Sequence, residues 1–442
     1  MNIVLDKSSA TEALIKITLN EKDYQPKVEE KVKDYSKKAS IKGFRPGKVP
    51  PGLIKKLYGK SILVEEINEL LSKSISEYIK KNEIKLIGEP LPNREKTAEI
   101  DWDNQREFEF EYQVGLIDEF NYNLNQKIKA YQIEIDNKTL EKTIEDLKKR
   151  YGNYSEPEES KPGDDFFGEL SQNSSEFKKE IWITNDQIRP KEIKHFIGLK
   201  KEAEIKFDPK KVLKDIKTVA RILGKSEKEM TEIKGEFIMK INKISRVELA
   251  ELNQEFFDKV FGKEVVKSKE EFLEKLKDTM QENYNNEAKN YTMKLIQDKL
   301  LDTTKIETPD NFYKKWIQET SKEEVTNQEL EENYGNYVED LKWTLIVNRV
   351  AEDNDIKVEH KDVVEHAKEL IKAQFAAYGM GDNVNENLEP FADNYLKGND
   401  GQNYYNTYNK VRSERIMNFI INKMDIGYKK VKPEDFSKLI SN

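Results

Sequence analysis

Residues 42–52 read KGFRPGKVPPG, a run of glycine and proline that a helix cannot continue through. Before this run, Val28 and Val32 recur at helical spacing, and after it Ile67 and Leu71 do the same. Both helical stretches must therefore stop at the run. The pattern predicts a loop that projects from the tip of a helical pair.

The side chains of this loop are suited to contact with a partner. Glycine and proline fix a tight turn, so Phe44 has no apolar neighbour within the loop to bury against. Arg45 can donate paired hydrogen bonds to a carboxylate or phosphate, and Lys48 adds charge. An exposed aromatic residue beside arginine is a frequent interface hot spot. A docking tip and a plain turn, in which Phe44 packs back on its own helices, both fit these residues.

Charge is distributed unevenly along the chain. The formal net charge is -8, yet residues 36–60 contain eight lysines and arginines and no acidic residue. A basic patch on an acidic protein indicates one anionic docking partner, such as rRNA or an acidic protein surface. The alternative is a solvated helix face.

Two strands are predicted around the helical pair. Ile15, Ile17 and Leu19 lie at every second position, and residues 107–114 alternate aromatic or aliphatic with Glu or Gln. An antiparallel pairing of these strands gives each one a buried face and a wet face. Residues 1–115 are therefore predicted to form an α+β module.

The middle of the chain changes character twice. Residues 116–150 form a connector with a short strand and an amphipathic helix, followed by a linker rich in Gly, Pro, Ser and Glu. Residues 151–247 then favour β-structure, with a polar helical insertion near 210–231. Candidate strands lie at 166–170, 180–183, 203–207 and 237–241.

From about Val247 the spacing of apolar residues predicts helices to the end of the chain. Aromatic residues and methionine gather where this periodicity is poor, in Gly- and Asn-containing sequence. Such side chains can be partly exposed and adaptable, which suits binding of unfolded polypeptides, although any one of them can instead pack between helices. The candidate substrate-binding residues are Phe375, Tyr378, Met380, Phe391, Tyr404 and Tyr405.

Several other classes of protein are disfavoured. The chain has no cysteine, and its three histidines are not spaced as a metal pair, so neither a metal site nor a thiol nucleophile is expected. Gly59-Lys60-Ser61 and Gly224-Lys225-Ser226 lack the first glycine of a P-loop, so no nucleotide hydrolysis is predicted. No signal-peptide pattern or long apolar run occurs, which predicts a soluble cytoplasmic protein.

The loop resembles the G-F-R-x-G-x-x-P signature of the trigger factor family, with Gly43, Phe44, Arg45, Gly47 and Pro50 matching. Pro46 departs from the family, because many members carry a basic residue there. The resemblance implies docking on the large ribosomal subunit near the exit tunnel, on a ribosomal protein and nearby rRNA. It assigns that contact to the side chains and backbone of Lys42, Gly43, Phe44, Arg45, Pro46, Gly47 and Lys48.

The resemblance also covers the order of the domains. It implies a multidomain α+β chaperone that needs neither ATP nor a cofactor, binds nascent or unfolded polypeptides, avoids membranes and can form a homodimer when free. Its docking domain and its helical body, which carries arms, are expected to lie next to each other. The expected parts are a ribosome-binding domain (1–115), a connector (116–150), a β-rich domain like FKBP-type prolyl isomerases (151–247) and a helical chaperone domain (248–442).

Isomerase activity of the middle domain stays open. The barrier to cis/trans rotation of a peptide bond is about 18–20 kcal/mol. An isomerase lowers this barrier by twisting the X-Pro bond in an apolar pocket with aromatic walls. Phe167, Trp182, Ile183 and Phe196 are the candidate lining, although they can equally form the core of the domain. The glycine-rich aromatic stretch usual in the family is replaced by residues 187–191. The alternative function is therefore a prolyl isomerase or a folding factor that works without the ribosome.

Overall fold

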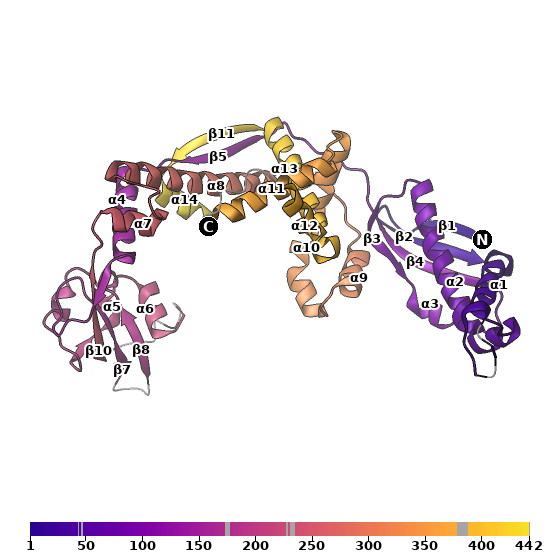
Figure 1. Cartoon of the computed structure of the whole chain (residues 1–442), viewed down its shortest axis with the longest axis horizontal. Coiled ribbons are helices and arrows are strands. Elements are labelled where there is room, and N and C mark those ends of the chain that lie inside the picture. Colours follow the sequence, from indigo (N-terminus) through magenta and orange to yellow (C-terminus); the bar gives the residue numbers. More distant parts are fainter. Residues whose placement is uncertain are drawn as a thin grey trace. The chain divides into compact units, whose positions relative to one another are not determined.

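The protein is described from a computed structural model (Figure 1). The residues whose structure is described are 1–42, 44–45, 47–172, 177–226, 229, 235–377 and 388–441. The predicted site residues Gly43, Pro46, Tyr378 and Met380 lie outside them. Helices and strands both occur, with the strands concentrated before residue 249, as the predicted multidomain α+β class requires.

The N-terminal region is a four-stranded antiparallel sheet with a long helical pair. Its elements are β1 (Asn2–Lys7), β2 (Glu12–Leu19), α1 (Glu21–Lys38), α2 (Pro51–Lys81), β3 (Leu86–Pro92), α3 (Arg94–Ala98) and β4 (Phe108–Leu116). The strand order is β1-β2-β4-β3. The predicted pairing of the two alternating strands is confirmed, with Ile17 opposite Phe110. The edge strand β1 was not predicted, because its largely exposed side chains carry little period-two signal.

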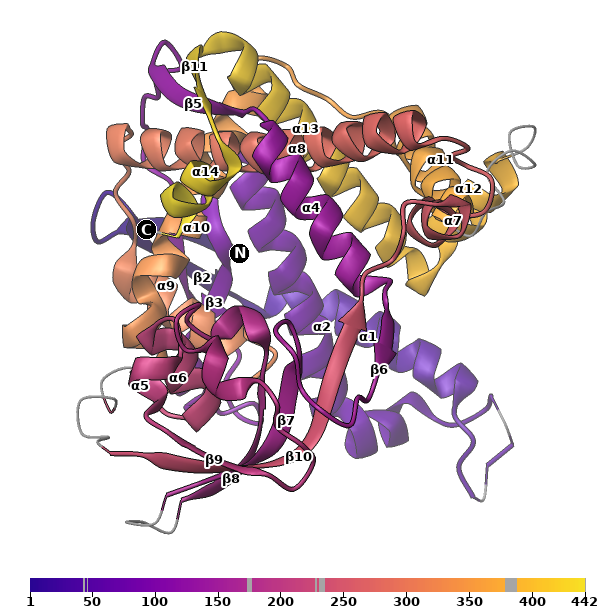
Figure 2. The same ribbon diagram turned by 90° about the vertical axis from the view of Figure 1, so that its left-hand side faces the viewer.

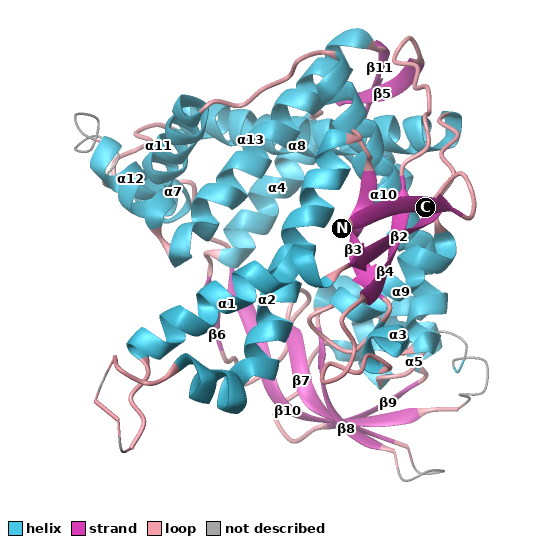
Figure 3. Ribbon diagram, turned by 90° about the vertical axis from the view of Figure 1, so that its right-hand side faces the viewer, coloured by secondary structure: helices cyan, strands magenta, loops and turns pink. Residues whose placement is uncertain are grey.

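One face of this sheet is covered by the two helices. Ile15, Ile17 and Phe108 on the strands form a single buried cluster with Val28 of α1 and Ile67 of α2. The alternation of β2 and the helical spacing of α1 and α2 therefore meet in one core (Figure 3).

The middle region is a connector followed by a five-stranded sheet. Its elements are β5 (Lys127–Ile133), α4 (Asn137–Arg150), β6 (Asn153–Ser155), β7 (Asp165–Ser171), β8 (Lys178–Ile183), the 3-10 turns η1 (Asn185–Gln187) and η2 (Ile193–Phe196), β9 (Glu204–Phe207), α5 (Pro209–Val212), α6 (Ile216–Leu223) and β10 (Phe237–Glu248). The order is β6-β10-β7-β8, and β9 also pairs with β10. The predicted insertion holds two short helices, the second of which packs Val219 and Leu223 into the domain core.

The C-terminal region is mainly helical. Its elements are α7 (Gln254–Phe261), α8 (Lys269–Thr303), α9 (Asp310–Thr320), α10 (Asn327–Asp353), α11 (His360–Ala377), α12 (Glu389–Lys397), η5 (Asn399–Gly401), α13 (Gln402–Lys423), β11 (Asp425–Val431) and α14 (Pro433–Ile440). The prediction of helices to the end was wrong at β11, which pairs with β5 in a two-stranded sheet. A strand with mostly exposed side chains depends on that distant partner, so no local pattern reveals it.

The chain divides into two compact units that interleave in sequence. Residues 1–129 and 292–427 form one unit, and residues 130–291 and 428–442 form the other. The expected proximity of the docking domain and the helical body is confirmed within the first unit. There the backbone N–H of Phe312 on α9 donates to Glu12 at 3.3 Å, and Lys315 Nζ donates to Gln113 at 3.0 Å.

Two glycines allow this contact between α9 and the N-terminal sheet. A Cβ on Gly115 of β4 would lie 2.5 Å from the ring of Phe312, and one on Gly88 of β3 would overlap the ring of Trp316. Gly88 also has φ +67°, a region in which other residues are strained. The two aromatic rings therefore occupy the space that a side chain at position 88 or 115 would need.

We expect Gly88→Ala to loosen α9 from the sheet, because the new methyl group collides with Trp316 and alanine at positive φ costs about 1–2 kcal/mol. Hydrogen exchange measured by mass spectrometry should accelerate in α9 and β3 peptides. Gly335→Ala is the matched control, since Gly335 lies inside α10 with nothing within 4 Å of an added Cβ. That change should stabilise α10 by about 0.5–1 kcal/mol. Unaltered exchange in α9 of the Gly88 variant would contradict this account.

Candidate functional site

The loop between α1 and α2 is fixed at its base. The Ser36 hydroxyl near the end of α1 donates a hydrogen bond to the carbonyl of Val49, and both residues are buried. Gly47 has φ +75°, and a Cβ there would lie 3.0 Å from the carbonyl oxygen of Lys37. The backbone at Gly47 and Val49 therefore lies directly against the last turn of α1.

The tip presents Phe44 to solvent. Its backbone N–H donates to Ile41 at 3.0 Å, and the N–H of Lys48 donates to Arg45 at 2.9 Å, so consecutive turns shape the described part of the loop. The Phe44 side chain is 41% exposed, and Arg45 and Lys48 are exposed too. This geometry favours the docking tip over the turn in which Phe44 packs back on its own helices.

The charge around the tip is largely uncompensated. Lys37 pairs with Asp34, and Lys60 pairs with Asp103. Among the residues that the structure describes, the other six cations of the segment 36–60 form no ion pair: Lys38, Lys42, Arg45, Lys48, Lys55 and Lys56. The first turn of α2 has no acidic residue, so its positive helix end adds to the same field.

Two exposed side chains of the basic segment were missed by the sequence reasoning. Leu57 and Tyr58 in the first part of α2 are both about half exposed. They follow the basic loop directly, so their place in a segment without acidic residues was the available signal. Their exposure adds apolar area to the basic segment 36–60.

An ion pair holds the two helices below the loop together. Lys31 of α1 lies 2.9 Å from Glu66 and 3.2 Å from Glu65, both on α2. Hydrogen bonds to Glu66 and then to Glu65 raise the pKa of the Lys31 ammonium group. Glu66 is buried, so this contact satisfies a carboxylate that would otherwise be costly to desolvate.

The four candidate residues of an isomerase pocket do not lie together. Ile183 and Phe196 are fully buried in the core of the middle domain. Phe167 and Trp182 face each other across β7 and β8 on the opposite side, with ring centroids 5.2 Å apart and Trp182 46% exposed. Trp182 and Ile183 are neighbours on one strand, so they point to opposite faces of the sheet.

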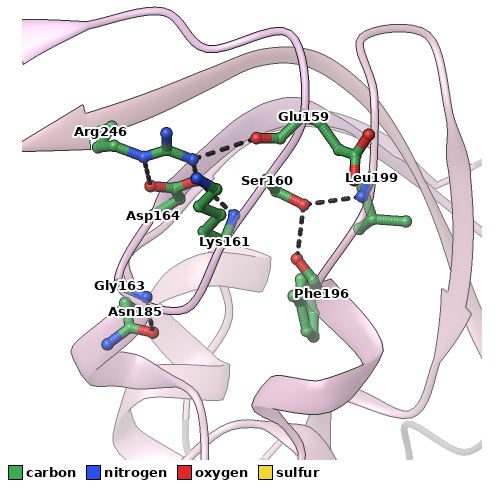
Figure 4. Close-up of polar contacts among 9 residues, drawn as sticks. All are labelled: Glu159, Ser160, Lys161, Gly163, Asp164, Asn185, Phe196, Leu199 and Arg246. Atoms are coloured by element: carbon green, nitrogen blue, oxygen red, sulfur yellow. Dashed lines mark hydrogen bonds and ion pairs between the residues drawn. The ribbon is translucent and has the colours of Figure 1, made fainter.

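Polar contacts fix the position of Phe196 (Figure 4). The buried Ser160 hydroxyl donates to the carbonyl of Phe196 at 2.8 Å and accepts from the N–H of Leu199 at 2.8 Å. On the same turn, buried Asp164 accepts two hydrogen bonds from Arg246, at 2.8 and 2.7 Å. Hydrogen bonding to this carboxylate raises the pKa of the Arg246 guanidinium. The network attaches the turn before β7 to β10 and suits a structural role.

The candidate substrate-binding residues of the helical region gather on α11, α12 and α13. Phe375 and Phe391 meet edge to face, with ring centroids 5.6 Å apart. Tyr404 stacks on His360 at 5.6 Å and packs against the same small core as Phe375. Phe391 is 51% exposed and Tyr405 is 61% exposed. Three of the four described candidates therefore surround one cluster, and Tyr405 points into solvent.

Exposed apolar side chains beside these residues extend the surface. Tyr395 on α12 and Leu370 on α11 are each more than a third exposed. We call the exposed residues Leu370, Phe391, Tyr395 and Tyr405 the aromatic surface. A scattered surface of this kind can contact many sequences weakly.

Three family models match consecutive parts of the chain. The model described as "Bacterial trigger factor protein (TF)" matches residues 1–147, "Probable trigger factor, FKBP-like domain" matches 154–249, and "Probable trigger factor, C-terminal domain" matches 294–440. Their order along this chain is that of one multidomain protein.

Curated relatives give the same result. A trigger factor of Francisella tularensis subsp. tularensis (strain FSC 198) is 24% identical over 400 residues, covering 84% of this chain and 86% of the relative. A trigger factor of Pelagibacter ubique (strain HTCC1062) is 22% identical over 396 residues, covering 84% of this chain and 77% of the relative. A solved structure described as "Promiscuous Substrate Recognition in Folding and Assembly Activities of the Trigger Factor Chaperone" is 17% identical, covers 96% of this chain and all of that one, and has a TM-score of 0.43.

These matches define a three-part chain with an FKBP-like middle domain. The chain belongs to the trigger factor family. Membership supports a chaperone role. Among the described residues, no helix combines the length and apolar character needed to cross a membrane.

We expect Phe196→Ala and Trp182→Ala to affect the middle domain very differently. Removing the buried Phe196 ring leaves a cavity and should cost about 3–5 kcal/mol. Removing the half-exposed Trp182 side chain should cost less than about 1 kcal/mol. Hydrogen exchange of peptides from β7 and β10 reports both effects. Equal losses of protection would show that the two rings share one environment, against the arrangement described above.

Proposed function

We propose that this chain is a ribosome-docking chaperone that works without ATP and shields unfolded segments of newly made polypeptides. It docks through Lys42, Phe44, Arg45 and Lys48 on the large ribosomal subunit near the exit tunnel, where a ribosomal protein and rRNA supply acidic groups. Docking there implies a cytoplasmic location. The proposed parts are a ribosome-binding domain at 1–115, a connector at 116–150, an isomerase-like domain at 151–247 and a chaperone domain at 248–442.

The observation that carries this proposal is the exposure of Phe44 in a loop whose base is held against α1. Gly47 and Ser36 hold the loop against α1, so burial of Phe44 requires a partner to supply the pocket. The unpaired cations around it favour a phosphate backbone or a carboxylate-rich surface. Arginine beside an exposed aromatic ring combines both kinds of contact at one point.

Client binding is assigned to the aromatic surface of α11–α13. Phe391 and Tyr405 are exposed on a helical cluster with only a small core of its own. Weak burial of apolar client segments there delays collapse and aggregation, and release follows by dissociation. No reaction step and no cofactor are required.

A prolyl isomerase is the second candidate function, because the middle domain matches an FKBP-like model. Two of the four proposed pocket residues, Ile183 and Phe196, are closed off inside the core. The observed geometry thus supports the chaperone proposal better than catalysis by that set of residues.

The Phe44→Ala, Arg45→Ala double variant should lose ribosome binding in a co-sedimentation assay. The wild type should pellet with ribosomes, and its bound fraction should fall as salt rises, because phosphate contacts release counterions. Circular dichroism checks that both proteins are folded.

Tyr428→Ala with Lys429→Ala is the matched control for that experiment, since it also removes an exposed aromatic residue followed by a cation. This control should pellet like the wild type. If the Phe44 and Arg45 variant pellets equally well, the loop is only a turn and the docking proposal fails.

The Phe391→Ala, Tyr405→Ala double variant should suppress aggregation of a chemically denatured protein several-fold less well than the wild type, with ribosome co-sedimentation unchanged. Each truncation removes apolar area worth about 25 cal/mol per Å² when a client covers it. Light scattering during dilution from denaturant measures the effect. Tyr154→Ala with Tyr428→Ala, which removes two other exposed aromatic rings, should leave suppression intact. Equal suppression by all three proteins would contradict the assignment.

A further inference from the structure

Among the described residues, no strand pairs with the outer edge of β8. β8 is the last strand in the order β6-β10-β7-β8. Figure 2 labels these strands in the middle domain. The N–H of Gln172 donates to the carbonyl of Phe177 across the hairpin. In this register, every second pair of residues along β7 and β8 exchanges backbone hydrogen bonds. Because such pairs alternate along an antiparallel ladder, the backbone groups of Glu180 and Trp182 point away from β7. Within the described residues no backbone bond outside the ladder uses them.

A pocket of about 400 Å³ runs along this edge. Four consecutive residues of β8, 179–182, line one side of it, and Arg221 and Ile222 of α6 line the other. Ile181 and Ile222 are buried and give it an apolar floor. The half-exposed Trp182, whose ring contacts that of Phe167 at a tilt, also lines the pocket. An open ladder beside a side-chain pocket is the arrangement that binds extended peptides in strand addition.

The charges of the pocket favour an acidic segment. Lys179 Nζ donates to the carbonyl of Ile222 at 3.0 Å and so fixes the end of α6 beside β8. Arg221 is exposed and has no ion pair among the described residues. From residue 216 to residue 226 the sequence around it contains lysine and arginine but no acidic residue. Glu180 is the one acidic residue in the lining.

We propose that the edge of β8 binds an extended, acidic segment of an unfolded polypeptide by strand addition. The segment pairs with the backbone of Glu180 and Trp182, places one apolar side chain in the pocket, and brings a neighbouring carboxylate to Arg221. This inference rests on the proposed chaperone function and adds a binding surface in the middle domain, separate from the aromatic surface of α11–α13.

A competing explanation is that Lys178, Lys179 and Glu180 protect a free edge from unwanted pairing, as charged residues on edge strands often do. Two observations favour binding. Lys178 is engaged by Glu169 at 2.9 Å and Lys179 by α6, so neither ammonium group stands free at the edge. The exposed Trp182 also adds apolar area where a protected edge would avoid it.

The test uses the full chain and three fluorescein-labelled twelve-residue peptides. The first alternates valine and threonine around a central leucine flanked by two glutamates. The second carries lysines in place of the glutamates, and the third is the acidic peptide with alternate backbone nitrogens methylated. Fluorescence anisotropy gives the dissociation constant of each peptide for the wild type, Trp182→Ala, Arg221→Glu and Lys217→Glu. Lys217 lies on the same helix, is exposed and does not line the pocket, so it is the matched charge control.

The acidic peptide should bind the wild type more tightly than the lysine peptide, and the methylated peptide should not bind, because it cannot pair with the strand. Arg221→Glu should weaken binding of the acidic peptide by about tenfold, the loss expected when a charge-assisted hydrogen bond is removed. Trp182→Ala should weaken it too, and Lys217→Glu should not.

Three results would overturn the inference: no binding of the acidic peptide, equal binding of the methylated peptide, or equal losses in Arg221→Glu and Lys217→Glu. Ribosome co-sedimentation and aggregation suppression are measured separately. If they persist while the peptide results are negative, the β8 edge is excluded and the proposed function stands.

Discussion

The contact of α9 with the N-terminal sheet makes one compact unit out of two distant parts of the chain. Phe312 and Trp316 lie where Gly115 and Gly88 have no side chains, and hydrogen bonds to Glu12 and Gln113 surround that contact. Aromatic rings bury large apolar areas, so two of them fitted onto bare backbone give a close interface from few residues. The helical body and the domain that carries the loop after α1 belong to the same compact unit.

Close backbone contact at a glycine also shapes the loop between α1 and α2. Gly47 permits the chain to return against the carbonyl of Lys37, and the Ser36 hydroxyl closes the base on Val49. Conformational freedom is thereby removed from the base of the loop. A partner that binds Phe44 and Arg45 therefore orders fewer residues on binding, which lowers the entropic cost of a contact made by a small tip.

The middle domain matches an FKBP-like model, and its four candidate pocket residues lie on two sides of the sheet. Its match to an FKBP-like model covers residues 154–249, yet its aromatic residues are divided between the two faces of the sheet. Ile183 and Phe196 stabilise the core, held in part by the buried Ser160 and the turn around Asp164. Trp182 and Phe167 instead form an outer surface beside the open edge of β8. Function in this domain must be argued from that surface, because a fold does not assign a site.

Features that depend on neighbours a few residues apart could be predicted from the sequence. The glycine and proline run predicted the break between α1 and α2, and alternation in β2 and β4 predicted their pairing. The segment without acidic residues located the basic loop. Alternation also implied that Trp182 and Ile183 could not share a pocket, a consequence that the sequence reasoning did not apply. The tertiary structure alone decided the pairing of β11 with β5, the seating of Trp316 on Gly88 and the exposure of Phe44. Those outcomes depend on which distant surfaces meet, and side-chain fit between segments hundreds of residues apart leaves no periodic signal in either of them.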